Sequence, residues 1–367
     1  MRNVLVSGAG VAGSALAYWL TRNGFAVTVV ERAESLRKGG QAIDVRGVAL
    51  QVIDRMGLGE QLRAARTQMR GMSMMDRDGN EMFRSEEKTL SAGRLDSDDI
   101  EVLREDLTAM IYEATKDGVE YVFDDTITAL HQEDHGVRVE FEKGGYRTFD
   151  FVIGADGMHS RVRGLAFGAE EKFIQHLGSY IAVFPSPNFL ELDNWQVWIQ
   201  DQESGAGGGV YPVRDNSELR ATFGFMSDRI DYDYRDVAQH KKLMADHLSH
   251  LGWEMPKFIE VMTDAPDFYF DAMAQIHMDK WSTGRVALVG DAAYCASVLS
   301  GQGTSIALVG AYILAEELGK ADHAEAFAAY ERRMRSYAEL NQALATENPG
   351  QPASEESMEK AKNAISL

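Results

Sequence analysis

Residues 1–31 read MRNVLVSGAGVAGSALAYWLTRNGFAVTVVE, and this stretch decides the fold of the N-terminal part of the chain. An apolar run of strand type, 4–6, comes first, and residues 8–13 then have the spacing G-x-G-x-x-G. A helical pattern of apolar residues follows, and a second strand-like run, 26–30, ends at Glu31. This order predicts a strand–helix–strand unit that binds a dinucleotide.

Each glycine of this turn has a separate physical task. Gly8 permits the tight turn, Gly10 lets the backbone approach a pyrophosphate, and Gly13 allows helix and strand to pack closely. The phosphates would meet free N–H groups at the positive end of the helix. Glu31 stands where a carboxylate would accept hydrogen bonds from a ribose diol. The other residues assigned to this cofactor turn are Val11, Ala12 and Arg32. An ordinary glycine-rich turn is the alternative, but it does not require the acid at that position.

Two further segments resemble known motifs. Residues 150–163 read DFVIGADGMHSRVR, with Asp156-Gly157 after an apolar run, and residues 285–305 read RVALVGDAAYCASVLSGQGTS. In this order and at these separations, the three segments resemble the fingerprints of the class A flavoprotein monooxygenases, the aromatic-hydroxylase family, in the branch that inactivates tetracyclines. The resemblance covers about residues 1–320.

The resemblance implies an α/β fold. We expect a Rossmann-like FAD-binding domain with a parallel sheet, a substrate domain with a mixed sheet, and a long C-terminal helix. The expected FAD-binding domain is discontinuous and comprises 1–80, 96–175 and 270–323, and the substrate-binding domain comprises 81–95 and 176–269. The C-terminal helix is expected over 324–347, followed by a polar, loosely attached tail over 348–367.

The resemblance also assigns residues to the flavin. Asp291 would hydrogen-bond the ribityl chain of FAD, and Arg104, in an Arg-x-x-Leu segment, would contact its phosphates and ribose. The helix that opens with Gly301, Gln302, Gly303 and Thr304 would point its positive end at the N1–C2=O edge of the ring, where reduced flavin is negatively charged. Asp156 and Gly157 would lie near FAD and serve NAD(P)H use as well.

A glycine-rich loop follows the second strand. Residues 39–47 resemble the family's loop that brackets the isoalloxazine, and paired glycines let the ring swing between two positions. By resemblance Gln41, Asp44 and Arg46 lie near the flavin, and Arg37, together with Arg46, is a candidate for NADPH contact. An ordinary surface loop with one Arg–Asp pair is the alternative.

One position departs from the family pattern in a way that bears on chemistry. Val298 stands where the family commonly has proline, beside the reactive face of the flavin. Valine removes a fixed φ and restores a backbone N–H, so the effect on oxygen activation stays open.

The substrate half is rich in aromatic and β-branched residues. Strands are predicted over 178–184, 195–200, 209–214 and 218–226, and helices over 236–251, 256–263 and 325–345. The side chains that could line a flat apolar pocket are Trp198, Tyr211, Phe223 and Phe225, although each could equally belong to the core or the sheet surface.

Composition excludes several classes of function. The 367 residues are 45% hydrophobic and carry a net charge of −20, which argues against nucleic acid or an anionic membrane as a partner. The single cysteine, Cys295, rules out an internal disulfide and fits a cytoplasmic protein, and no Cys/His spacing suggests a metal site. A monomer or a homodimer is expected.

The expected activity is that of a single-component monooxygenase. Non-covalent FAD would be reduced by NADPH or NADH and would react with O2 to a C4a-hydroperoxide that hydroxylates an aromatic or polyketide-like molecule, such as a natural product or antibiotic. No amino-acid general base is assigned. Two alternatives stay open: an FAD oxidoreductase of the same fold that does not hydroxylate (a reductase or a Baeyer–Villiger type), and a protein that sequesters a ligand beside a flavin.

Overall fold

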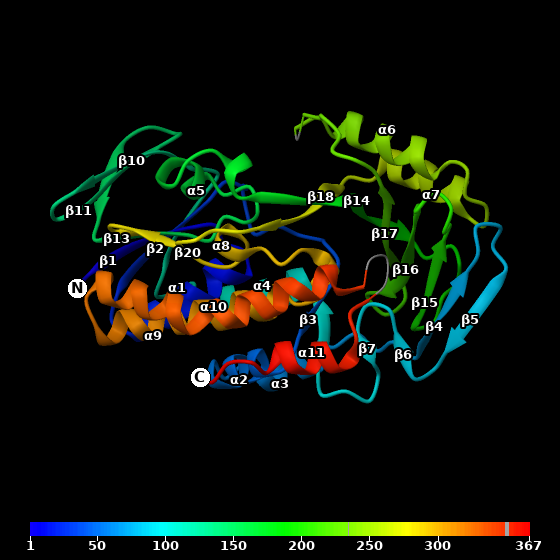
Figure 1. The fold of residues 1–367 in the computed structure, drawn as a ribbon, viewed down its shortest axis with the longest axis horizontal. Helices are drawn as coiled ribbons and strands as arrows, with labels where there is room; N and C mark the ends of the chain where they lie inside the picture. Colours follow the sequence, from blue (N-terminus) through cyan, green and yellow to red (C-terminus); the bar gives the residue numbers. More distant parts are fainter. Residues whose placement is uncertain (234, 349–351) are drawn as a thin grey trace.

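The first structural unit is built on a six-stranded sheet with the strand order β19-β20-β13-β1-β2-β9 (Figure 1). The computed structural model describes residues 1–233, 235–348 and 352–367. β1 pairs in parallel with β2 and β13, as a strand–helix–strand crossover through α1 (Val11–Arg22) requires. The strands are Asn3–Ser7 (β1), Ala26–Glu31 (β2), Glu120–Phe123 (β9), Phe151–Gly154 (β13), Ser282–Thr283 (β19) and Val286–Leu288 (β20).

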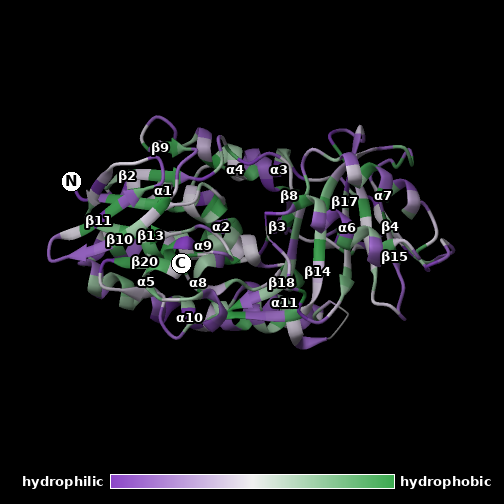
Figure 2. Ribbon diagram, turned by 90° about the horizontal axis from the view of Figure 1, so that it is seen from above, coloured by the Kyte–Doolittle hydropathy of each residue, from purple (hydrophilic) through white to green (hydrophobic). Residues whose placement is uncertain are grey.

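Helices pack against this sheet on one side. α9 (Gly303–Lys320) lies between α1 and α10 (His323–Glu347), which explains why α9 is apolar and buried over most of its length. Figure 2 shows hydrophobic residues gathered on the central strands of the sheet. The remaining elements of this unit are α2 (Val48–Arg55), α3 (Gly59–Ala64), α4 (Arg104–Glu113), α5 (Arg161–Ala166), η1 (Glu170–Lys172), α8 (Asp291–Tyr294), η2 (Val298–Ser300), β10 (Ile127–Glu133), β11 (Gly136–Phe141) and β12 (Tyr146–Phe149), with β3 (Ala42–Val45) paired to β8 (Ile100–Leu103).

The second unit is a mixed seven-stranded sheet with the order β18-β14-β17-β16-β15-β4-β5. Its strands are Gly71–Met75 (β4), Glu81–Ser85 (β5), Ile174–Pro187 (β14), Trp195–Gln200 (β15), Gly207–Val213 (β16), Glu218–Met226 (β17) and Tyr269–Ile276 (β18); the hairpin β6 (Lys88–Thr89) and β7 (Gly93–Arg94) stands beside it. Helices α6 (Val237–Leu248) and α7 (Met255–Asp264) cover one face (Figure 1). The other face of this sheet is turned toward the first unit, because Tyr211 of β16 and Arg220 of β17 bond to the backbone of residues 40–42.

The expected fold class is confirmed, and β15 and β17 coincide with the predicted strands. Two expected domain boundaries are wrong. β4 (71–75) and β18 (269–276) belong to the seven-stranded sheet, whereas 1–80 and 270–323 were assigned to the FAD-binding domain. The reason is long-range pairing, since β4 joins β15 in parallel and β18 joins β14. Neither partner lies near its strand in the sequence.

The expectation of a loosely attached tail is also wrong over α11 (Glu355–Lys362). Lys362 is buried and its Nζ lies 2.8 Å from Asp99 Oδ2, and Met358 Sδ lies 2.6 Å from Arg46 Nη1. Polar composition suggested an unpacked segment, but the Lys362–Asp99 ion pair and the contact of Met358 with Arg46 hold the helix to the first unit (Figure 1). Residues 349–351 of the expected tail lie outside the described residues. Over the described residues, no helix has the length and apolar character needed to cross a membrane.

Candidate cofactor site

The turn after β1 has the close packing that the glycine spacing predicts. A Cβ at Gly8, whose φ is +103°, would lie 2.5 Å from the carbonyl oxygen of Ala155, and a Cβ at Gly13 would lie 1.9 Å from the carbonyl oxygen of Gly8. By contrast, a Cβ at Gly10 would meet no atom within 4 Å. The first and third glycines therefore let strand, turn and helix pack together, and Gly10, followed by Val11 and Ala12 of α1, borders open space.

Glu31 ends β2 beside this turn. Its Oε2 accepts a hydrogen bond from the Ala9 amide at 2.8 Å and its Oε1 accepts one from the Ala33 amide at 2.9 Å. A carboxylate oxygen has more than one acceptor direction, so both oxygens can still accept from a ribose hydroxyl. Arg32, the next residue, is exposed.

Asp156 has a structural task. Its Oδ1 accepts from the Ser160 hydroxyl at 2.5 Å, and its Oδ2 accepts from the Val162 amide at 3.1 Å and the Ser7 hydroxyl at 3.4 Å. Burial raises the pKa of this carboxyl. The Asp-Gly turn thus ties the start of α5 to β1, while Gly157, with φ +82°, has open space at its Cβ position.

Asp291 lies next to the glycine-rich turn. It begins α8 directly after Gly290, whose Cβ position is 2.9 Å from the Cβ of Ala12 on α1. Asp291 is exposed to solvent, yet enough protein surrounds it that burial raises the pKa of its carboxyl. The residue therefore presents an acceptor to the open space beside the glycine-rich turn, which we call the cleft.

The segment before α9 also borders this cleft. Val298 and Leu299 in η2 are 48% and 44% exposed, although both are large hydrophobic residues. Gly301 is left-handed with φ +62°, and a Cβ at Gly303, where α9 begins, would meet no atom within 4 Å. The first N–H groups of an eighteen-residue helix, those of Gly303 and Thr304, therefore stand at the cleft. Gln302 is fully buried, so the expectation that it contacts a cofactor is wrong for its side chain.

Arg37 and Arg46, which were expected to act together, lie on either side of β3 and differ in their surroundings. Arg46 is 3% exposed, and its Nη2 pairs with Asp44 Oδ2 at 2.8 Å and donates to the Ser91 carbonyl at 2.9 Å. Burial, opposed by Arg46, raises the pKa of Asp44 to about 7. Arg46 is therefore unavailable for a phosphate, which corrects that expectation. Arg37 is exposed and stands 5.1 Å from the ring centre of Tyr269.

Arg104 begins α4 and contacts the same loop. Its Nη2 donates to the Gly39 carbonyl at 3.1 Å, and its amide donates to the Gln41 carbonyl at 3.3 Å. Burial, with the nearby charge of Arg37, lowers the pKa of this guanidinium. Gly40 must be glycine here, because its φ is +92° and a Cβ would lie 2.6 Å from Arg104 Nε.

The four aromatic residues proposed for substrate divide between the two faces of the seven-stranded sheet. Phe223 and Phe225 face the helices, where Phe223 packs on Phe258 and Phe225 stacks on His247 with ring centres 3.8 Å apart. They belong to the core, so the expectation that they line a pocket is wrong. Trp198 and Tyr211 are on the opposite face, but Tyr211 is buried and its hydroxyl accepts from the Ala42 amide at 2.7 Å.

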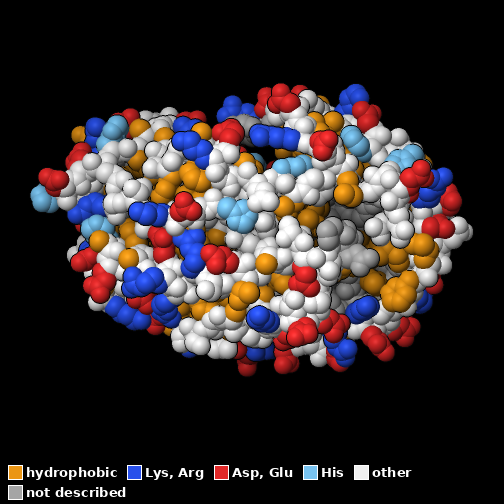
Figure 3. Space-filling model, viewed as in Figure 1, with side chains coloured by type: hydrophobic (Ala, Val, Ile, Leu, Met, Phe, Trp, Pro, Cys, Tyr) orange, Lys and Arg blue, Asp and Glu red, His pale blue; other side chains and the backbone are white. Residues whose placement is uncertain are grey.

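Of these four aromatic residues, only Trp198 is half-buried. Its indole Nε1 donates to Gln196 Oε1 at 2.9 Å, and a Cβ at Gly209 on the neighbouring strand would lie 2.3 Å from the indole ring. The ring therefore lies across the glycine, where any other residue would displace it. Figure 3 shows the surface hollowed between the two units, near the middle of the molecule.

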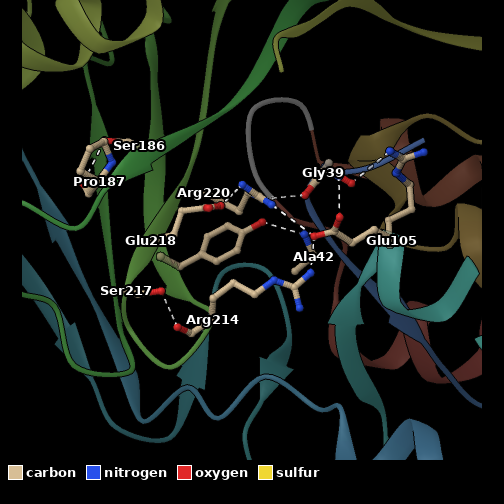
Figure 4. A network of polar contacts seen from close by, with 12 residues as sticks. Gly39, Ala42, Glu105, Ser186, Pro187, Arg214, Ser217, Glu218 and Arg220 are labelled. Carbon is tan, nitrogen blue, oxygen red and sulfur yellow. Dashed lines mark hydrogen bonds and ion pairs between the residues drawn. The ribbon is translucent and has the colours of Figure 1, made fainter. Parts of the chain in front are cut away.

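Two residues that connect the units have no distinguishing sequence signal. Glu105 follows Arg104 in the first turn of α4, and Arg220 is a buried residue of β17 (Figure 4). An acid in the first turn of a helix is common for reasons of the helix dipole alone. An arginine within a predicted strand likewise gives no indication of a partner in the other unit.

Comparisons with known proteins agree with this geometry. The family model described as an FAD binding domain matches residues 1–347. An uncharacterised protein of Mycobacterium tuberculosis (strain H37Rv) is 50% identical over 371 residues, which cover 100% of this chain and 99% of that protein. A flavin-dependent monooxygenase from an unknown prokaryotic organism is 41% identical over 94% of this chain and 88% of its own length. The crystal structure of tetracycline destructase Tet(55) superposes with a TM-score of 0.89 at 38% identity, covering 100% of this chain and 98% of that one.

Proposed function

Because this chain belongs to the FAD-binding family of class A flavin-dependent monooxygenases, we propose that it uses FAD, NAD(P)H and O2 to hydroxylate an aromatic or polyketide-like small molecule. FAD, when bound, supplies the redox chemistry: it takes a hydride from the nicotinamide and activates oxygen. The protein's part is to bind, orient and shield the reacting groups.

One observation carries the proposal: three segments far apart in the sequence meet at the carboxyl edge of the six-stranded sheet. They are the turn at Gly10, the acid Asp291 and the N-terminus of α9 at Gly303. This edge is where open α/β sheets bind nucleotides. The open Cβ positions at Gly10 and Gly303 and the solvent-facing carboxylate of Asp291 fit the pyrophosphate, the ring edge and the ribityl hydroxyls of FAD, respectively.

Charge in the cleft suits a flavin that becomes anionic on reduction. The N–H groups of Gly303 and Thr304 and the helix dipole favour negative charge at the ring edge. Glu31 would hold the ribose, and Arg104 would stand near the flavin's phosphates and ribose. Arg37 is the exposed cation placed to meet an NAD(P)H phosphate.

A flat apolar ligand suits the sheet that faces the cleft. Trp198 presents an indole ring laid across Gly209, and its Nε1 is held by Gln196, so the ring is oriented in advance. The name of the similar structure, tetracycline destructase, supports a phenolic polyketide as the first compound to test.

The test starts with purified protein. We expect a yellow protein whose FAD is released by acid, NADPH or NADH oxidation accelerated by tetracycline or another phenolic compound, and a product that gains one oxygen atom from labelled O2. A folded protein that takes up no FAD on titration would end the proposal.

One observation favours a second candidate, an FAD oxidoreductase that does not hydroxylate. Val298, in place of the family's proline, is exposed in the cleft and begins η2. If a ligand speeds NAD(P)H oxidation while the labelled oxygen appears only in hydrogen peroxide or water, this second function is the correct one.

A further inference from the structure

The loop beside the flavin site is held by side chains of other elements. Gly39 donates its amide to Glu105 Oε2 at 2.7 Å, and its carbonyl accepts from Arg104 at 3.1 Å. The Gly40 carbonyl accepts from Arg220 Nε at 3.1 Å, and the Ala42 amide donates to the Tyr211 hydroxyl at 2.7 Å (Figure 4). Two of these four partners, Arg220 and Tyr211, lie on the seven-stranded sheet, so hydrogen bonds connect the sheet directly to the loop.

Space around the loop is also tight. Gly39 and Gly40 have φ angles of +71° and +92°, and a Cβ at Gly39 would lie 1.6 Å from Asp267 Oδ2. Glycine is therefore required at both positions. Because glycine has no side chain, this part of the backbone is not held in place by side-chain packing of its own. The hydrogen bonds from α4, β16 and β17 set its position instead.

Glu105 contacts both the loop and two arginines of the substrate sheet region, Arg214 and Arg220 (Figure 4). One carboxylate oxygen holds the Gly39 amide, and the other accepts from Arg214 and, at 3.4 Å, from Arg220. Arg220 is 5% exposed and also pairs with Glu218. Although partial burial opposes ionisation, the Gly39 amide and the Arg214 guanidinium lower the pKa of Glu105, so the carboxylate is charged over the working range of pH.

We propose that Glu105 is a positioning residue that fixes the loop 39–42 against the substrate sheet and so sets the geometry of the flavin site. The proposal rests on the proposed function for its effect on flavin reduction, but its effect on the loop does not. Besides the direct bonds of Arg220 and Tyr211 to the loop, this carboxylate joins the Gly39 amide to Arg214 and Arg220 by charge-assisted hydrogen bonds.

The chain provides a direct probe of the loop. Arg37 and Lys38 are exposed trypsin sites directly before Gly39. In E105A, we expect tryptic cleavage at these two sites to rise about tenfold relative to cleavage elsewhere, the scale set by losing hydrogen bonds to a charged group. E105Q should show a smaller rise, because its amide oxygen still accepts from the Gly39 amide.

Asp106 supplies the matched control. It is the next residue of α4 and pairs with Arg214 at 3.1 Å, and within the part of the chain that the structure describes its side chain forms no hydrogen bond to the loop. D106N should therefore be cleaved at 37 and 38 like the parent. If E105A unfolds as a whole, cleavage will rise at all sites, and E105Q then provides the test. Cleavage of E105Q at 37 and 38 equal to that of the parent would overturn the proposal.

The rate at which bound FAD is reduced tests whether Glu105 sets the geometry of the flavin site or only stabilises the loop. With FAD saturating, E105A should reduce its bound FAD with NADPH about tenfold more slowly than the parent, while FAD affinity stays within about twofold. Faster cleavage with an unchanged reduction rate would overturn the positioning role. A parent protein whose FAD neither NADPH nor NADH reduces would overturn the proposed function instead, because the proteolysis result does not depend on it.

Discussion

At the residue scale, the acids around the cleft differ in what their oxygen atoms already bind. Asp156 accepts hydrogen bonds from Ser160, Val162 and Ser7, and Asp44 pairs with Arg46. Asp291 instead faces solvent from the start of α8, near Ala12. The two Asp-containing motifs thus differ in use: one fastens a turn, and the other presents a carboxylate.

We therefore expect Asp291→Asn to lower FAD affinity by one to two decades, since each hydrogen bond to a charged acceptor is worth roughly 1.5–3 kcal/mol. Fluorescence titration with FAD measures this. Asp156→Asn is the control. It should lower the melting temperature and leave FAD affinity nearly unchanged, because its carboxylate is hydrogen-bonded within the fold. Equal FAD affinity in a folded Asp291→Asn protein would show that this acid does not touch the flavin.

Arg37 and Arg46 also differ at this scale, since Arg37 is exposed and Arg46 is buried. Arg37→Ala should raise the apparent KM for NADPH about tenfold with FAD content unchanged, because an exposed cation is removed from the cleft. Arg70→Ala, an exposed arginine paired with Asp193 elsewhere, is the control. Initial rates at varied NADPH give the answer. A loss of FAD in step with the rise in KM would reassign Arg37 to the flavin.

At the scale of elements, α11 is attached to the first unit by a buried ion pair. Lys362 Nζ lies 2.8 Å from Asp99 Oδ2, and these side chains are 8% and 11% exposed. Asp99 also accepts from the Gly47 amide at 3.1 Å. The end of the chain is therefore connected to the segment that follows β3, close to Arg46.

We expect Lys362→Ala to lower the free energy of unfolding by about 3 kcal/mol, because it leaves the buried Asp99 carboxylate without its cation. Lys360→Ala, which removes an exposed lysine from the same helix, should leave stability unchanged. Denaturant unfolding of both variants compares them, and hydrogen exchange should show α11 opening in the first alone. Matching midpoints would mean that α11 does not contribute to global stability.

At the scale of the whole molecule, His159 connects the two units. It lies in the loop before α5, with Nδ1 2.8 Å from Glu170 and Nε2 3.2 Å from Asp271 on β18. Hydrogen bonds with Asp271 and Glu170 outweigh burial and raise the pKa of this imidazole from 6.5 to about 10. The histidine is therefore cationic at neutral pH and faces two acids.

This raised pKa gives a definite sign to the pH dependence. The stabilisation is fully present below about pH 6.5, where the unfolded histidine is also protonated, and is lost as pH rises to about 10. His159→Gln should remove this decline between the two pH values. Melting temperatures of parent and variant across that range test it, and parallel curves would contradict the assignment.

Much of the first unit could be predicted because its signals are local. The G-x-G-x-x-G spacing, the strand before it and Glu31 after it lie within one short stretch, and Gly8 and Gly13 have the close contacts that the motif requires. The same holds for β15 and β17, whose residue types favour strands on their own. Asp291 and the opening of α9, which the sequence also predicts to serve the flavin, lie near this turn in the structure, and their role stays a prediction.

Tertiary structure decided what depends on which residues meet. Phe223 and Trp198 belong to equally aromatic strands, and only the position of α6 and α7 makes one core and leaves the other beside the cleft. Arg37 and Arg46 flank the short strand β3, and only the fold buries the second against Asp44 and Ser91. The role proposed for Glu105 and the ordering of α11 have the same origin, because their partners are far away in the sequence. Local composition reports strand, helix and turn, whereas burial and pairing are properties of the assembled chain.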